Sequence, residues 1–300
     1  MFGSGSSNPA LNKDVFAPAQ TWEDLERQGR SVRGVDFNAA EDEAAALASA
    51  EIAAKRDGRM TMQGTINKSF FLLALVVTGA LGTWMLLAEQ RSPGLGLGLT
   101  FGGAIVGVIA GLVMAFWPKG SAFLAPVYGI AQGAFVGGIS SFYAMQFGGK
   151  AMADGKVVLN TGLIFNASLL TFGIAGATLA LYGFKVIRPG RMFHNAVAVG
   201  FGGLILYILA ALVAGWCGFP AMSSVFDPTN GGMISLGFSG LLLLLGAASF
   251  VTDYDMVSNG VKNRAEKYYE WYGAYAIMAT LVFVYIQALR LMAKLTSRRE

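Results

Sequence analysis

Long apolar runs dominate the chain from about residue 69 onward, with polar and charged residues gathered between them. Each run covers about 20 residues or more, which is the length an α-helix needs to cross roughly 30 Å of hydrocarbon. The pattern therefore predicts an all-α integral membrane protein with seven transmembrane helices. We place the spans at about 69–88, 95–117, 122–147, 157–183, 195–218, 233–256 and 272–293.

The segment 1–67 has a different pattern. Its opening is rich in Gly, Ser, Pro and Asn and has no apolar period, so it cannot bury enough surface to offset its ordering entropy. We predict a largely disordered tail that contains one short Ala-rich helix at about 38–57, opened by a capping box at Asn38. The seven-span membrane domain then covers 68–295, and 296–300 forms a basic C-terminal tail.

Composition narrows the class of protein further. Of the 300 residues, 54% are hydrophobic and 13% are charged, far from the roughly quarter-charged composition of soluble domains. One cysteine and one histidine argue against a disulfide scaffold and a histidine-based metal site. The basic residues are scattered, which argues against nucleic-acid binding. We find no nucleophile beside a base and no calcium-binding loop, so we expect no enzyme and no cofactor beyond weakly bound calcium.

The distribution of Lys and Arg near the span ends predicts the orientation in the membrane. With the N-terminus inside, the cytoplasmic segments carry eleven basic residues and the opposite side carries six. We therefore predict a multi-pass protein with a cytoplasmic N-terminus. An odd number of spans puts the basic C-terminus outside, which leaves open the alternative that the seventh segment re-enters the membrane without crossing it.

Small residues recur at four-residue spacing in the second and third spans. This spacing lets membrane helices approach closely, and we expect it to serve helix packing. The positions are Gly98 and Gly102, then Gly103, Gly107 and Gly111, and Gly133 and Gly137.

Ionisable residues inside the spans are costly in lipid, so each one is a candidate for function. These residues are Asp253 and Asp255 in span six and Arg290 in span seven. Two positions on a helix two residues apart differ by about 200°, so at most one aspartate faces the bundle interior. A carboxyl group held away from water favours its neutral form, and its protonation could gate a path. The alternative is an interfacial carboxylate that reaches water at the end of the span.

Several motifs follow one another along the chain in a specific order. They are SSNP at Ser6 to Pro9, GGISSFY at Gly137 to Tyr143, VTDYDMVSNGV at the end of span six, and KYYEWYGAYAIMATLVFVYIQALRLMAKL in span seven. Together they resemble the Bax inhibitor-1 (transmembrane Bax-inhibitor-motif) family in its bacterial form. The resemblance covers roughly residues 60–295.

This resemblance implies seven helices with the last one at the centre, and a pH-sensitive calcium leak in a bacterial plasma membrane. It also implies a hydrogen-bonded pair of aspartates on the last two helices. Asp255 falls at the first of these positions, with Asp253 as the neighbouring alternative, and the second position matches Gln287, which cannot release a proton. Substitute partners for Asp255 are Asp253, Glu270, Lys262 and Arg264.

Two functional hypotheses follow. The first is a slow leak of calcium or another cation, in which protonation near Asp255 sets the open fraction. The second is a non-conducting interaction protein that binds a membrane partner such as a protease, as the resemblance implies for some bacterial relatives. The lack of a second acid at Gln287 favours the second hypothesis.

Overall fold

The structure is a computed structural model of the full chain. It describes residues 42, 45, 46, 48, 49, 52–54, 56–88, 92–147, 159–187, 189–216, 227, 229 and 232–298. The chain forms two units, Met1–Ala53 and Ala54–Glu300. Residues 1–41 of the predicted tail lie outside the described part, as do some positions of the predicted helix at 38–57. Every described residue from 42 to 56 is helical.

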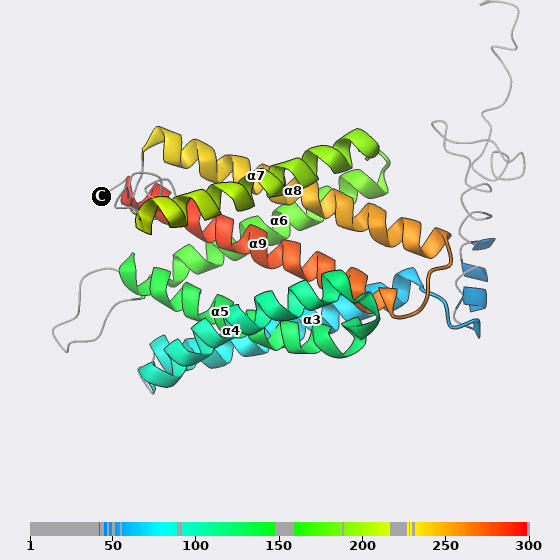
Figure 1. The fold of residues 1–300 in the computed structure, drawn as a ribbon, viewed down its shortest axis with the longest axis horizontal. Coiled ribbons are helices and arrows are strands. Elements are labelled where there is room, and N and C mark those ends of the chain that lie inside the picture. The colour runs from blue at the N-terminus through cyan, green and yellow to red at the C-terminus, as the bar shows by residue number, and fades with distance from the viewer. Residues whose placement is uncertain are drawn as a thin grey trace, which may run out of the picture. The chain divides into compact units, whose positions relative to one another are not determined.

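The second unit is a bundle of long helices (Figure 1). They are α3 (Met62–Ala88), α4 (Pro93–Phe116), α5 (Ser121–Gln146), α6 (Thr161–Gly183), α7 (Arg191–Trp216), α8 (Met233–Lys262) and α9 (Tyr269–Ser297), with a short 3-10 turn at Pro118–Gly120. Within the described part of the chain, seven helices are long and apolar enough to cross a membrane. The predicted all-α seven-span architecture is confirmed.

Several helices extend beyond their apolar runs. Helix α3 begins at Met62 and α8 continues to Lys262, because a helix does not have to stop where the hydrocarbon ends. The seventh span, α9, is one unbroken helix of 29 residues. At 1.5 Å per residue it is about 43 Å long, more than the roughly 30 Å of the hydrocarbon core. Its length is that of a full crossing, and the re-entrant alternative does not fit an unbroken helix.

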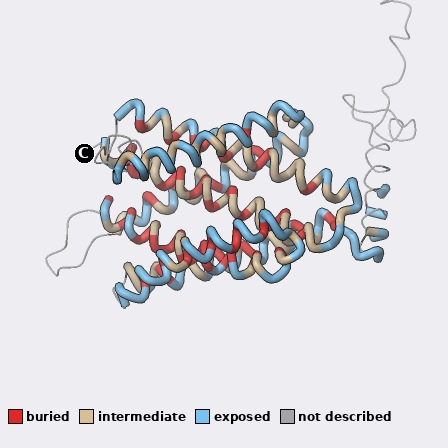
Figure 2. Tube along the Cα trace, viewed as in Figure 1, coloured by how far each residue is buried: buried red, intermediate tan, exposed pale blue. Residues whose placement is uncertain are grey.

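Helix α9 lies at the centre of the bundle, as the resemblance implied. In Figure 1 it runs between α6, α7 and α8 on one side and α3, α4 and α5 on the other. It packs on α3, α5, α6 and α8. Contact with α4 comes through Tyr275, whose hydroxyl donates to the carbonyl of Gly111, and contact with α7 through the rings of Phe201 and Phe283. Buried residues concentrate along α5 and α9 (Figure 2).

The predicted close packing of small residues is present between α3 and α5. A Cβ atom at Gly133 would meet the backbone of Val76, and one at Gly137 would meet the backbone of Ala80. Larger residues at these positions would force the two helices apart. In α4, Gly103 faces the backbone of α5 at Ala131 and Gly107 faces the side chain of Gln132, whereas Gly98 and Gly102 face open space and do not take part.

Candidate functional site

The two aspartates of α8 point to different neighbours. Asp253 faces the central helix α9, and Asp255 faces the ends of α6 and α7. This divergence is the one that their spacing predicts, since two residues on a helix advance by about 200°. Asp253 is therefore the aspartate at the α8–α9 contact, which answers the choice that the sequence left open.

Asp253 accepts a hydrogen bond from a neutral partner. The Oγ1 of Thr280 donates to its Oδ2 across a distance of 2.6 Å. This length is within the range of about 2.5–2.7 Å that is typical of a hydroxyl donating to an ionised carboxylate. The partner of Asp253 on the last helix is thus a threonine, which carries no charge and releases no proton near neutral pH.

Tyrosines surround this contact. Tyr272 and Tyr275 of α9 and Tyr254 of α8 are near enough to interact electrostatically with Asp253. The hydroxyl of Tyr254 donates to the carbonyl of Ala175 on α6, at 3.1 Å. The Tyr275 ring packs edge-on against Tyr128 of α5, with centroids 4.9 Å apart. The carboxyl group of Asp253 is therefore bordered by aromatic rings and hydroxyls from α8 and α9.

Asp255 belongs to a separate and more open group. It accepts hydrogen bonds from Tyr182 of α6 at 3.1 Å and from Asn259 of its own helix at 2.9 Å. The Nε2 of His194, in the first turns of α7, lies 3.4 Å from its second oxygen. The side chain of Asp255 keeps 17% of its surface exposed, and that of His194 keeps 35%. These contacts tie α6, α7 and α8 together near the protein surface.

Gln287, the predicted second position, does not reach either aspartate. It lies seven residues beyond Thr280 on α9, about 10 Å along the helix axis at 1.5 Å per residue. Its Oε1 accepts a hydrogen bond from Arg290 at 3.3 Å. A straight antiparallel pair of helices places Asp253 opposite Thr280, and so the pairing of Asp255 with Gln287 is not formed.

Glu270, a predicted substitute partner for Asp255, is instead bound to the start of α3. It is 2% exposed and accepts hydrogen bonds from the backbone N–H of Thr61 at 2.9 Å and from the Thr61 hydroxyl at 2.8 Å. It also forms an ion pair with Lys68, whose Nζ lies over the ring of Trp271. A Cβ on Gly64 would collide with the Glu270 carboxylate, so the glycine leaves room for the contacts of Glu270 with Thr61 and Lys68.

The other two predicted partners also lie away from the aspartates. Arg264 pairs with Asp57, next to a backbone hydrogen bond of 2.8 Å from Met60 to the carbonyl of Ala265. Lys262 is the exposed last residue of α8. The segment before α3 is thus attached to the loop between α8 and α9, and Arg264 serves this attachment.

Lys294 is a buried charge that lies one residue past the predicted end of the seventh span at 293. It is 0% exposed, and its Nζ donates to the carbonyl of Ser235 at 3.1 Å and to the hydroxyl of Ser239 at 2.9 Å. Asp227 interacts with it electrostatically. Hydrogen bonds from Thr229 to Asp227, together with this attraction, hold the pKa of the Asp227 carboxyl below its usual value.

Comparison with known proteins adds the family. The model of a family described as Bax inhibitor 1 like matches residues 8–297, nearly the whole chain. The chain belongs to the Bax inhibitor 1 like family. The match confirms the resemblance and extends it from about residue 60 back to residue 8. No curated protein and no solved structure matches the chain.

Within this Bax inhibitor 1 like protein, the residue that sequence reasoning missed is Thr280. A search for ionisable residues passes over a threonine inside an apolar span. The signal that could have found it is geometric, since the antiparallel pairing of α8 and α9 around their loop puts Thr280 at the level of Asp253. Lys294 was missed because the apolar run ends before it, although the helix continues.

Proposed function

We propose that this protein lets calcium or another cation pass slowly across the membrane, and that protonation of Asp253 sets the fraction of open molecules. Family membership, seven membrane-spanning helices and an acid at the contact of the last two helices support this proposal. The observation that carries it is the hydrogen bond from Thr280 to Asp253. The proposed sensor is thus Asp253, in place of the Asp255 that the resemblance favoured.

The direction of the pH effect follows from the chemistry of this bond. A hydroxyl bonded to an ionised carboxylate is held roughly twice as strongly as one bonded to a neutral acceptor. Ionised Asp253 therefore holds α8 against α9, which we assign to the closed state. Proton uptake leaves a weaker, neutral hydrogen bond and favours separation of the helices, so the flux rises as the pH falls. Tyr254, Tyr272 and Tyr275 face the same carboxyl group, and their phenol hydroxyls do not ionise near neutral pH.

Calcium in this proposal is cargo that binds weakly. A path needs few ligands, because an ion that binds tightly cannot leave. The oxygens of Asp253 and of the hydroxyls around it would supply brief contacts. We assign no catalytic residue and no resident cofactor. From the distribution of basic residues we further propose a bacterial plasma membrane with the N-terminus in the cytoplasm.

A second candidate function is a non-conducting protein that binds a membrane partner such as a protease. Two observations favour it. The partner of Asp253 on α9 is a threonine, so this contact lacks the second acid that the family resemblance implies, and Lys294 puts a buried positive charge between α8 and α9, where it would repel a passing cation. In this case the bundle is a scaffold, and the first unit, Met1–Ala53, is a candidate for partner contact.

The test is calcium entry into liposomes that contain the purified protein, recorded between about pH 6 and pH 8, the range in which a partly buried carboxyl group can titrate. We compare the native chain with Asp253→Asn and with the matched variant Asp255→Asn. The proposal predicts a flux that rises toward low pH, that Asp253→Asn fixes at its high value, and that Asp255→Asn leaves pH-dependent.

The scaffold alternative predicts no flux above that of empty liposomes at any pH. Deletion of residues 1–53 separates the two functions further, since it removes the first unit and keeps the attachment of Asp57 and Met60 to the loop after α8. A leak would survive this deletion, whereas partner binding through the tail would not.

A further inference from the structure

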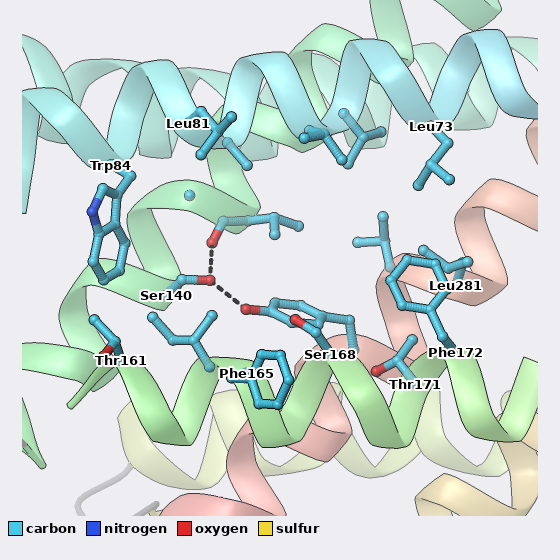
Figure 3. Close-up of a pocket in the computed structure, with 18 residues that line it drawn as sticks. Leu73, Leu81, Trp84, Ser140, Thr161, Phe165, Ser168, Thr171, Phe172 and Leu281 are labelled. Atoms are coloured by element: carbon cyan, nitrogen blue, oxygen red, sulfur yellow. Dashed lines mark hydrogen bonds between the residues drawn. The ribbon is translucent and has the colours of Figure 1, made fainter.

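A pocket opens between α3 and α6 on the side of the bundle (Figure 3). It has a volume of ≈ 460 Å³, within the range of about 300–1,000 Å³ that small-molecule sites have. Leu73, Leu81 and Trp84 reach into it from α3, and Phe165 and Phe172 from α6. Helices α5 and α9 complete its wall. Both helices at its mouth cross the membrane, so the opening faces lipid and not water.

Several polar groups in the wall have partners within the protein. Ser140 donates its single hydroxyl proton to the carbonyl of Val136 at 2.7 Å, so the 2.7 Å contact with Tyr285 has the tyrosine hydroxyl as donor. The hydroxyl of Thr171 donates to the carbonyl of Ala167 at 2.7 Å. These groups need no polar ligand. The remaining wall is mainly aliphatic and aromatic, with Ser168 hydrogen-bonded to Tyr285 and Thr161 at one end. The pocket is therefore suited to hydrocarbon.

The two ends of the pocket differ along the membrane normal. Trp84 is near the end of α3 and Thr161 is the first residue of α6, so both lie at the same end of the bundle. Tryptophan is enriched where the membrane meets water. From Thr161 to Phe172 the pocket follows α6 over eleven helical steps, roughly 16 Å at 1.5 Å per step. This is about half of the 30 Å hydrocarbon core, the depth of one leaflet.

From the apolar wall, the lateral opening and the depth of one leaflet, we infer that the pocket holds one acyl chain of a bilayer phospholipid, with the head group beside Trp84 and Thr161. The bilayer is the source of this chain, because hydrocarbon surrounds the mouth. The chain would lie against Leu281, Val282 and Tyr285 of α9, directly after Thr280. The inference concerns binding and does not depend on whether the protein conducts ions.

The test uses the full-length protein in liposomes with a trace of phosphatidylcholine that carries a photoreactive diazirine midway along one acyl chain. After illumination, mass spectrometry locates the labelled residues. Two variants are compared with the native chain. Val77→Trp places an indole in the pocket, and Val106→Trp makes the same change on α4 at a residue outside the pocket. The two valines are 46% and 43% exposed, respectively.

We expect the label to concentrate on pocket residues of α3 and α6. Val77→Trp should lower the labelling of Phe165 and Phe172 about tenfold, the change that 1.4 kcal/mol of lost contact produces, and Val106→Trp should leave it unchanged. Leu81→Trp, at a half-exposed position of the mouth, gives the same readout if Val77→Trp does not fold. Even labelling of all lipid-facing residues, equal labelling in both variants, or cross-links to a second copy of the chain in place of lipid would overturn the inference.

Discussion

A buried acid and a partly buried acid meet the last helix in different ways. Glu270, in the first turn of α9, has a positive partner in Lys68 and two further donors from Thr61. Asp253, on α8, has the neutral hydroxyl of Thr280. The negative charge of Glu270 is balanced inside the protein, whereas that of Asp253 is held by a dipole alone.

This difference assigns the two acids to different roles. Glu270, with the opposite charge of Lys68 and two donors of Thr61 around it, acts as a joint between the start of α3 and α9. A carboxylate without such a partner changes its charge more readily. The comparison teaches that burial alone does not identify a proton-sensitive group, because the partner decides whether its charge can change.

The largest expected effect is on the joint. Glu270→Ala leaves Lys68 and Thr61 without their acceptor, and breaking a buried ion pair on one side costs about 3–5 kcal/mol. Since Lys68 keeps 18% of its side chain exposed, we expect the lower end of this range. Denaturant unfolding in detergent measures it, with the exposed Glu266→Ala in the preceding loop as the control. Equal stability of the two variants would remove the joint from the account.

A smaller loss of stability is expected at the hydrogen bond between Thr280 and Asp253. Thr280→Val deletes the donor to Asp253 and keeps the shape of the side chain. Loss of a hydrogen bond to a charged group costs about 1.5–3 kcal/mol. The same unfolding experiment measures it near neutral pH. Thr296→Val is the matched control, because the hydroxyl of Thr296 bonds only within α9, to the carbonyl of Met292. A loss no larger than that of the control would show that Asp253 is not held by this bond.

A second acid at position 280 would sharpen the comparison between Asp253 and Glu270. Thr280→Asp places two carboxyl groups against each other, and a pair of this kind shares a proton and titrates as one unit. We expect the flux–pH curve to move to higher pH by about one unit, which corresponds to about 1.4 kcal/mol. Calcium entry into liposomes measures the shift. An unchanged curve would contradict a contact between positions 253 and 280.

The smallest effect is expected at the other aspartate. Asp255→Asn removes a carboxylate oxygen near His194 but keeps an oxygen for Tyr182, and a partly exposed pair of this kind contributes less than about 1 kcal/mol even when both groups are charged. Thermal unfolding should change little, and the flux should keep its dependence on pH. A flat flux curve in this variant would move the sensor from Asp253 to Asp255.

The sequence was sufficient for the number of spans, because hydropathy and length are local properties. It also identified the two aspartates of span six, Asp253 and Asp255, as candidates for function. It could not identify Thr280, since a hydroxyl inside an apolar helix acquires its role only from the opposite helix. The apolar pattern likewise could not place Lys294 inside the bundle, because Ser235 and Ser239, which bind it, are more than 50 positions away in the chain.

The central claim is that Asp253 changes its charge between about pH 6 and pH 8. Infrared difference spectra of the protein in liposomes, taken between about pH 6 and pH 8, detect protonated carboxyl groups directly. The account predicts a carboxylic acid band that fades as the pH rises, that is absent in Asp253→Asn and that persists in Glu270→Gln. A band that is unchanged in Asp253→Asn, or that disappears in Glu270→Gln, would contradict it.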